Sequence, residues 1–124
     1  MKIILAETAG FCFGVDRAVK MVYDLLESGA RVATLGPIIH NPQIVDELLG
    51  RRVRIVESPE ECLPGETLVI RSHGVARDIY ERAEKANIPV SDATCPFVAK
   101  IHRIVSERSA AGDIILIAGD RNHQ

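Results

Sequence analysis

The 124-residue chain is long enough for one domain, or for one domain and part of a second, and its 47% hydrophobic and 26% charged residues are ordinary for a globular protein. With a formal net charge of −2 and scattered basic residues, it offers no positive stripe for nucleic acid. No apolar run is long enough to cross a bilayer, and the N-terminal run is too short for a signal peptide, so we expect a cytoplasmic protein.

Strand and helix signals alternate along the chain. In order, the pattern predicts a strand at 2–6, a helix at 16–27, a strand at 31–35, a helix at 42–50, a strand at 53–56, a loop or helical turn at 57–65, a strand at 67–71, a helix at 78–85, a strand at 89–91, a helix at 97–110 and a strand at 113–118. Such alternation favours parallel strands with right-handed crossovers.

The predicted fold class is therefore α/β: a parallel-sheet lobe with flanking helices, plus the start of a second α/β lobe. Because Trp is absent and other aromatics are scarce, the core has to be aliphatic, as in a sheet buried on both faces. We expect residues 1–13 to form an N-terminal strand and loop, residues 14–96 the first lobe, and residues 97–124 the beginning of the second.

Reactive side chains follow the predicted strands. Cys12, His40, His73, Cys95 and His123 each come shortly after one. In parallel α/β sheets the carboxyl ends of the strands share one edge, and ligands bind there. We therefore expect these five residues to contribute to a common site.

The cysteines have more than one reading. Cys12 lies in Gly-Phe-Cys-Phe-Gly, where glycines permit close approach of a bulky ligand and the aromatics would shield it, but a structural turn cysteine fits equally well. Cys95 precedes a proline and would cap a helix, where the helix dipole favours a thiolate. Cys62 stands in an acidic loop, where carboxylates raise a thiol pKa, so we expect an incidental thiol.

The histidines are also ambiguous when taken singly. His40 and His73 each precede a predicted helix, where an imidazole can face a bound anion beside free N–H groups, although a capping or solvated side chain is the plainer reading. His102 lies within a predicted helix and is expected to be structural.

Five segments, taken in order, are similar to motifs of one enzyme family. They are Gly-Phe-Cys-Phe-Gly-Val-Asp-Arg-Ala from residue 10, Ile-His-Asn-Pro from residue 39, Ser-His-Gly-Val from residue 72, Asp-Ala-Thr-Cys-Pro from residue 92 and Gly-Asp-Arg-Asn-His from residue 119. On these segments the chain resembles the N-terminal portion of the 4-hydroxy-3-methylbut-2-enyl diphosphate reductase (IspH/LytB) family.

The resemblance implies an iron–sulfur oxidoreductase of the non-mevalonate isoprenoid pathway, which uses two electrons and two protons to make isopentenyl and dimethylallyl diphosphate. It implies that Cys12 and Cys95 are two of three cysteines holding a 4Fe–4S cluster. It also implies that His40, His73 and His123 bind the substrate, chiefly its diphosphate, and that a ferredoxin or flavodoxin donates electrons. Thiolates are the usual ligands of such clusters.

The chain departs from the family pattern in several places. A third cluster cysteine, the glutamate that follows the match to His123 and a Ser/Asn segment for the diphosphate are not present, and Gln124 stands where the family continues Pro-Glu. No catalytic residue is assigned, since the family's proton donor would lie beyond Gln124. Family members form three α/β lobes, with the first strand in the sheet of the last lobe. We therefore expect this polypeptide alone to be inactive and residues 2–6 to present an unsatisfied edge.

Two alternatives remain open at this point. One is a split reductase that works with a separate C-terminal portion. The other is a small non-redox α/β module that binds a metal or phosphate, with zinc held by Cys12, Cys95 and a histidine.

Overall fold

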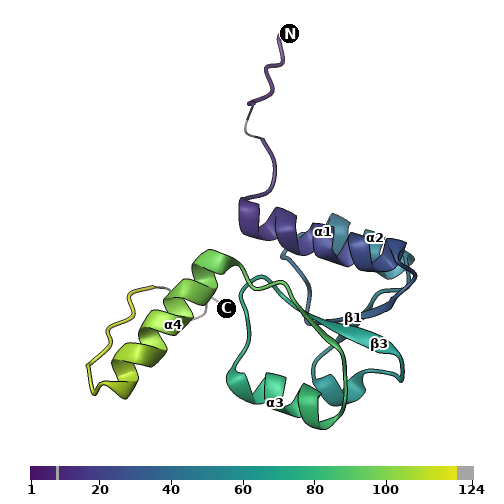
Figure 1. Ribbon diagram of the computed structural model, residues 1–124. Coiled ribbons are helices and arrows are strands. Elements are labelled where there is room, and N and C mark those ends of the chain that lie inside the picture. Colours follow the sequence, from purple (N-terminus) through teal and green to yellow (C-terminus); the bar gives the residue numbers. More distant parts are fainter. Residues whose placement is uncertain (8, 120–124) are drawn as a thin grey trace.

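Short aliphatic runs form the centre of the molecule. The computed structural model, which describes residues 1–7 and 9–119, contains a sheet of four parallel strands in the order β2-β1-β3-β4 (Figure 1). The strands are β1 (Arg31–Leu35), β2 (Arg54–Val56), β3 (Glu66–Ile70) and β4 (Val90–Asp92). The helices are α1 (Phe13–Glu27), α2 (Pro42–Gly50), the 3-10 turn η1 (Pro59–Glu61), α3 (Arg77–Lys85) and α4 (Pro96–Ala110).

Alternation along the strands buries both faces of this sheet. Val32 and Val69 pack into one hydrophobic cluster with residues of α1 and α2, whereas Ala33, Leu68 and Ile70 pack into a second cluster with residues of α3. Figure 1 shows α1 and α2 on one side of the strands and α3 on the other. Successive residues of a strand point to opposite faces, so a strand covered on both sides has to be aliphatic throughout. The predicted α/β class with a parallel sheet and flanking helices is confirmed.

Local signals explain where the second helix begins. The Asn41 side-chain oxygen accepts a hydrogen bond from the backbone N–H of Ile44 at 3.2 Å, and Pro42 occupies the first helical position. Both are favoured there, because Asn satisfies a free N–H group and Pro has none to satisfy.

The first helix starts earlier than the sequence pattern predicts. We expected a start near Asp16, but α1 begins at Phe13 with Cys12 as its N-cap, and the Cys12 carbonyl accepts from the Asp16 N–H at 2.9 Å. Asp16 instead lies in the first turn, where its carboxylate faces the positive end of the helix dipole. The thiol-bearing residue is thus placed at the helix terminus itself.

Two predicted strands are wrong for the described structure. Residues 2–6 and 113–118 have no strand conformation. A strand exists through hydrogen bonds to a neighbour, and no described residue pairs with either segment. Their large apolar side chains are consequently exposed, as shown by Leu5 at 82% and Leu116 at 92%.

The last helix is also poorly covered. None of the residues of α4 is buried, and Figure 1 shows the helix standing away from the sheet. The division into residues 1–13, 14–96 and 97–124 remains a prediction. Within the described parts of the chain, no helix has the length and apolar character needed to span a membrane.

Candidate functional site

The carboxyl-terminal edge of the sheet brings several loops together. The loops after β1, β3 and β4 carry His40, His73 and Cys95, respectively. The N-terminus of α1 reaches the same edge, because α1 packs on the sheet and a short turn returns the chain from its other end into β1. Residues that are distant in sequence therefore meet at this edge, as expected for a parallel α/β sheet.

Cys95 is fixed from more than one direction. Its N–H donates to the Ser72 carbonyl at 2.9 Å, which joins the β4 loop to the β3 loop, and its carbonyl accepts from the Ala99 N–H at 2.9 Å in the first turn of α4. The residue is half-buried and is the N-cap of α4. Its side chain lies against Gly14, since a Cβ atom built on Gly14 would be 2.6 Å from the Cys95 Sγ.

Cys12 is adjacent to this contact but more open. It caps α1 two residues before Gly14, and its side chain is exposed. The flanking rings are exposed as well, Phe11 at 44% and Phe13 at 61%, and their role in shielding a bound ligand stays a prediction. Phe11 lines a cavity together with Val15 and Ile39. Phe13 instead meets Phe97 of α4 edge to face, with ring centroids 6.2 Å apart.

His40 and His73 form a close pair. Their ring centroids are 5.3 Å apart, with an interplanar angle of 47°. Together with Phe11, Asn41 and Ser72 they line a cavity of about 260 Å³ beside the start of α2. His40 is exposed and His73 half-buried, so a ligand could reach both rings from solvent. Two imidazoles and a helix N-terminus favour an anionic ligand.

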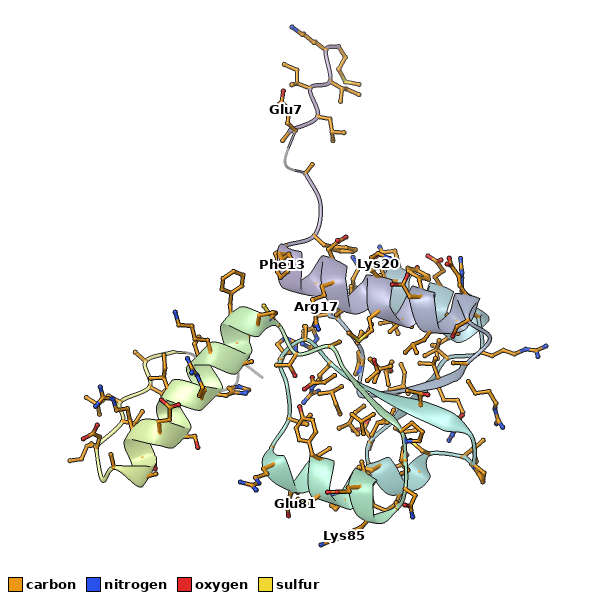
Figure 2. All side chains as sticks on the ribbon, in the orientation of Figure 1. Glu7, Phe13, Arg17, Lys20, Glu81 and Lys85 are labelled. Atoms are coloured by element: carbon orange, nitrogen blue, oxygen red, sulfur yellow. The ribbon has the colours of Figure 1, made fainter. Side chains whose placement is uncertain are left out.

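Sequence reasoning missed Arg17 and Tyr80, which hold the turn before Cys95. Arg17 donates to the Thr94 and Asp92 carbonyls, and Tyr80 donates to the Asp92 carboxylate. Figure 2 shows Arg17 on α1, on the side that faces this turn. Partial burial raises the pKa of the Tyr80 hydroxyl, which keeps it protonated as a donor. The available signal for Arg17 was its place in the segment Gly-Phe-Cys-Phe-Gly-Val-Asp-Arg-Ala, whereas nothing in the sequence signals Tyr80.

The remaining candidates lie elsewhere. Cys62 follows η1 at the amino-terminal end of β3, whereas Cys95 follows the carboxyl end of β4, so the two cysteines belong to opposite edges of the sheet. Burial, and secondarily Glu66, raises the pKa of Cys62. His102 is exposed on α4, with its ring near the turn at Gly74, and its structural role stays a prediction. His123 and Gln124 lie outside the described residues.

The thiols fit part of a metal cluster site. Thiol side chains at two helix N-caps suit iron–sulfur ligation, and the absence of a side chain on Gly14 lets Cys95 lie close to the start of α1. Within residues 1–7 and 9–119, however, no three His, Cys, Asp or Glu side chains converge into a site that could hold a metal ion. The described chain therefore offers two candidate thiolate ligands rather than a closed site.

Fold and site together define an α/β protein whose thiols and imidazoles gather at one edge of a parallel sheet. A model of the LytB protein family matches residues 3–124, and the chain belongs to that family. It is 46% identical over 127 residues to the 4-hydroxy-3-methylbut-2-enyl diphosphate reductase of Caldanaerobacter subterraneus subsp. tengcongensis, which covers 99% of this chain and 44% of the relative. The enzyme of the same name from Geobacter sp. (strain M21) is 47% identical over 123 residues, with the same two coverages.

Solved structures give the same picture. A structure of (E)-4-hydroxy-3-methyl-but-2-enyl diphosphate reductase, the terminal enzyme of the non-mevalonate pathway, matches with a TM-score of 0.79 and 44% identity over 98% of this chain and 43% of the other. The Plasmodium falciparum E-1-hydroxy-2-methyl-but-2-enyl-4-diphosphate reductase matches with a TM-score of 0.87 and 30% identity over 94% of this chain and 37% of the other. The chain thus spans less than half the length of these relatives.

Proposed function

We propose that this chain contributes cluster ligands and diphosphate contacts to a 4-hydroxy-3-methylbut-2-enyl diphosphate reductase. The observation that supports this proposal most is the placement of two groups at one edge of the sheet. One is Cys95, which lies against the start of α1, and the other is the His40–His73 pair. In the proposed reaction the substrate takes up two electrons and two protons, loses its hydroxyl as water and yields isopentenyl or dimethylallyl diphosphate.

The diphosphate contact rests on His40 and His73. Imidazole rings whose centroids lie 5.3 Å apart can face two phosphate oxygens at once, and the positive end of the α2 dipole adds to the attraction for an anion. The role predicted for His123 is part of the same proposal, although that residue lies outside the described structure.

The cluster contact rests on Cys12 and Cys95. A bound 4Fe–4S cluster would supply electrons and a Lewis-acidic iron for the substrate oxygen. This chain's residues would hold two corners of it by thiolate bonds. Cys62 does not belong to this ligand set because it lies at the other edge of the sheet. A ferredoxin or flavodoxin as electron donor and a cytoplasmic location complete the proposal.

Metal loading tests the cluster part. The chain is incubated anaerobically with iron and sulfide, desalted, and analysed for iron, acid-labile sulfide and zinc. We expect Cys12→Ser and Cys95→Ser to lose most of the bound iron and sulfide, while the matched control Cys62→Ser retains the wild-type amount. Equal loading of Cys12→Ser and Cys95→Ser with the wild type would refute the ligand assignment. Zinc bound without acid-labile sulfide would support the non-redox metal module instead.

Calorimetric titration with inorganic pyrophosphate tests the anion part. Removing one imidazole should weaken binding about tenfold, as expected for loss of a charge-assisted hydrogen bond. The variants are His40→Gln and His73→Gln, with Lys85→Gln on α3 as a control for the loss of a surface cation. Unchanged affinity in both histidine variants would rule out the proposed diphosphate contact.

A further inference from the structure

The turn between β4 and α4 is held by side chains from two other helices, α1 and α3. We propose that Arg17 of α1 and Tyr80 of α3 are positioning residues that hold Cys95 against the N-terminus of α1. The proposal deepens the function proposed above, which supplies the reason why the position of Cys95 matters. The contacts themselves are independent of any bound cluster.

Arg17 provides the anchor on one side. Its Nη1 donates to the Thr94 carbonyl at 3.2 Å, and its Nη2 lies 3.4 Å from the Asp92 carbonyl. Two donors of one planar guanidinium thus bridge the residues immediately before Cys95. A guanidinium suits this task because its fork is rigid and always charged. The fork ties α1 to a turn that is more than seventy residues away in sequence.

Tyr80 provides the anchor on the other side. Its hydroxyl donates to Asp92 Oδ2 at 2.9 Å. The other carboxylate oxygen, Oδ1, accepts from the Thr94 N–H at 2.8 Å and from the Thr94 hydroxyl. Asp92 therefore folds the turn onto itself while Tyr80 holds the carboxylate in place. The buried Ala93 N–H donates to the Ile70 carbonyl at 3.0 Å, so the same turn is also tied to β3.

The two anchors act where Cys95 has little freedom. Its Sγ and Cβ sit over Gly14, which has no side chain to displace. Moving the turn by an ångström would lift the thiol off α1 and change its position relative to Cys12. Loss of either anchor should therefore expose Cys95 without unfolding the sheet, because neither Arg17 nor Tyr80 belongs to the fully buried core.

Thiol alkylation in the full chain tests the proposal without any metal. The metal-free protein is treated with iodoacetamide at several pH values and digested with trypsin, which leaves each cysteine in a different peptide, so that three rates are obtained by mass spectrometry. We expect Arg17→Met and Tyr80→Phe to raise the rate at Cys95 about tenfold, the equivalent of about 1.4 kcal/mol lost from the closed arrangement. Arg17→Lys, which keeps the charge without the fork, should give an intermediate rate.

Each variant has a matched control. Lys20→Met alters the next exposed cation on α1, and Tyr23→Phe removes the other tyrosine hydroxyl; both should leave Cys95 unchanged. Cys62 at the opposite edge reports general loosening. A Cys95 rate within twofold of wild type in Arg17→Met and Tyr80→Phe would overturn the proposal.

General loosening also has a defined meaning. If the alkylation rates of Cys62 and Cys95 rise together in Arg17→Met, the isosteric variant Tyr80→Phe distinguishes the two explanations. A joint rise in Tyr80→Phe as well would show that Arg17 and Tyr80 only stabilise the fold, and would overturn the proposal. Failure of cluster loading leaves these rates untouched, so the proposed function and the positioning role can fail separately.

Discussion

Gly14 and Cys95 approach so closely that a side chain on the glycine has no room: a Cβ atom would lie 2.6 Å from Sγ and 2.8 Å from Cβ of Cys95. Gly14 has ordinary helical geometry, so alanine there would otherwise favour the helix. We expect Gly14→Ala to cost about 1–2 kcal/mol of unfolding free energy, since overpacking outweighs the gain in helix propensity. Urea unfolding measures the loss, and cluster loading should fall with it.

Gly50 provides the matched control for this substitution. It is the last residue of α2, and a Cβ there would meet no atom within 4 Å. Gly50→Ala should leave stability unchanged or raise it by no more than about 1 kcal/mol. If both variants behaved alike, the contact with Cys95 would have no energetic weight.

Leu68 is the second test, because it lies at the centre of the cluster beneath α3 and is wholly buried. Leu68→Ala should lower the free energy of unfolding by about 2–5 kcal/mol, from lost burial and the cavity left behind. Leu63, with 45% of its surface exposed, serves as control, and Leu63→Ala should cost less than about 1 kcal/mol. Chemical denaturation with a constant m-value checks both.

The ion pair between Glu60 and Arg82 predicts a pH dependence. The hydrogen bond from the Arg82 guanidinium, with Nε 2.8 Å from Glu60 Oε1, lowers the pKa of the carboxyl from 4.5 to about 2. A carboxyl whose folded pKa lies below its unfolded value stabilises the protein above the unfolded pKa and loses that effect as pH falls through the folded pKa. Stability linked to Glu60 should therefore disappear between about pH 4.5 and about pH 2.

Glu60→Gln removes the titrating group and should flatten this part of the curve, as measured by urea unfolding at low ionic strength. Both side chains are partly exposed, so added salt should weaken the difference. A parallel fall of wild type and Glu60→Gln over this range would show that the pair contributes nothing.

The cysteines themselves should differ in reactivity. Burial raises the pKa of Cys62, which lowers its thiolate fraction at neutral pH, whereas Cys12 is exposed. Alkylation at pH 7 should therefore be faster at Cys12 than at Cys62. The alkylation rate at Cys62 should keep rising at pH values above the ordinary pKa of a thiol, because its thiolate forms only there. A faster Cys62 at pH 7 would contradict its placement in the cluster beneath α3.

The exposed apolar segments predict self-association. Residues 2–6 and 113–118 carry large side chains with little cover, including Leu5 at 82% and Leu116 at 92% exposure. Leu5→Lys and Leu116→Lys should reduce concentration-dependent association in sedimentation velocity experiments, because charge disfavours both apolar contact and strand pairing. Ala86→Lys on the exposed end of α3 controls for the added charge. A wild-type chain that stays monomeric at all concentrations would refute the prediction.

Local sequence signals sufficed where local chemistry decides the structure. The aliphatic run at β1 and the Asn-Pro pair before α2 predicted both elements correctly, because each depends on its own residues and immediate neighbours. The rule that parallel strands present their carboxyl ends together also anticipated the meeting of His40 and His73. The binding and ligand roles of these side chains stay predictions.

Long-range contacts could not be anticipated in the same way. Arg17 and Thr94 are 77 positions apart, and nothing near either residue indicates the other. Residues 2–6 show the reverse problem, since their pattern is typical of a strand but a strand also needs a partner to bond with. Propensity therefore described what the segment favours, and pairing determined what it forms.

Cys95 is also the point from which α4 projects. The helix has no buried residue, and its fifteen residues extend about 22 Å at 1.5 Å per residue. If α4 tilted by about 20° around its first turn, its far end would travel about 8 Å, while Cys95, at the pivot and tied to Ser72, would scarcely move. A tilt of α4 therefore leaves the Cys95 thiol in place. The helix can pack in different ways along its length while the sulfur stays against Gly14.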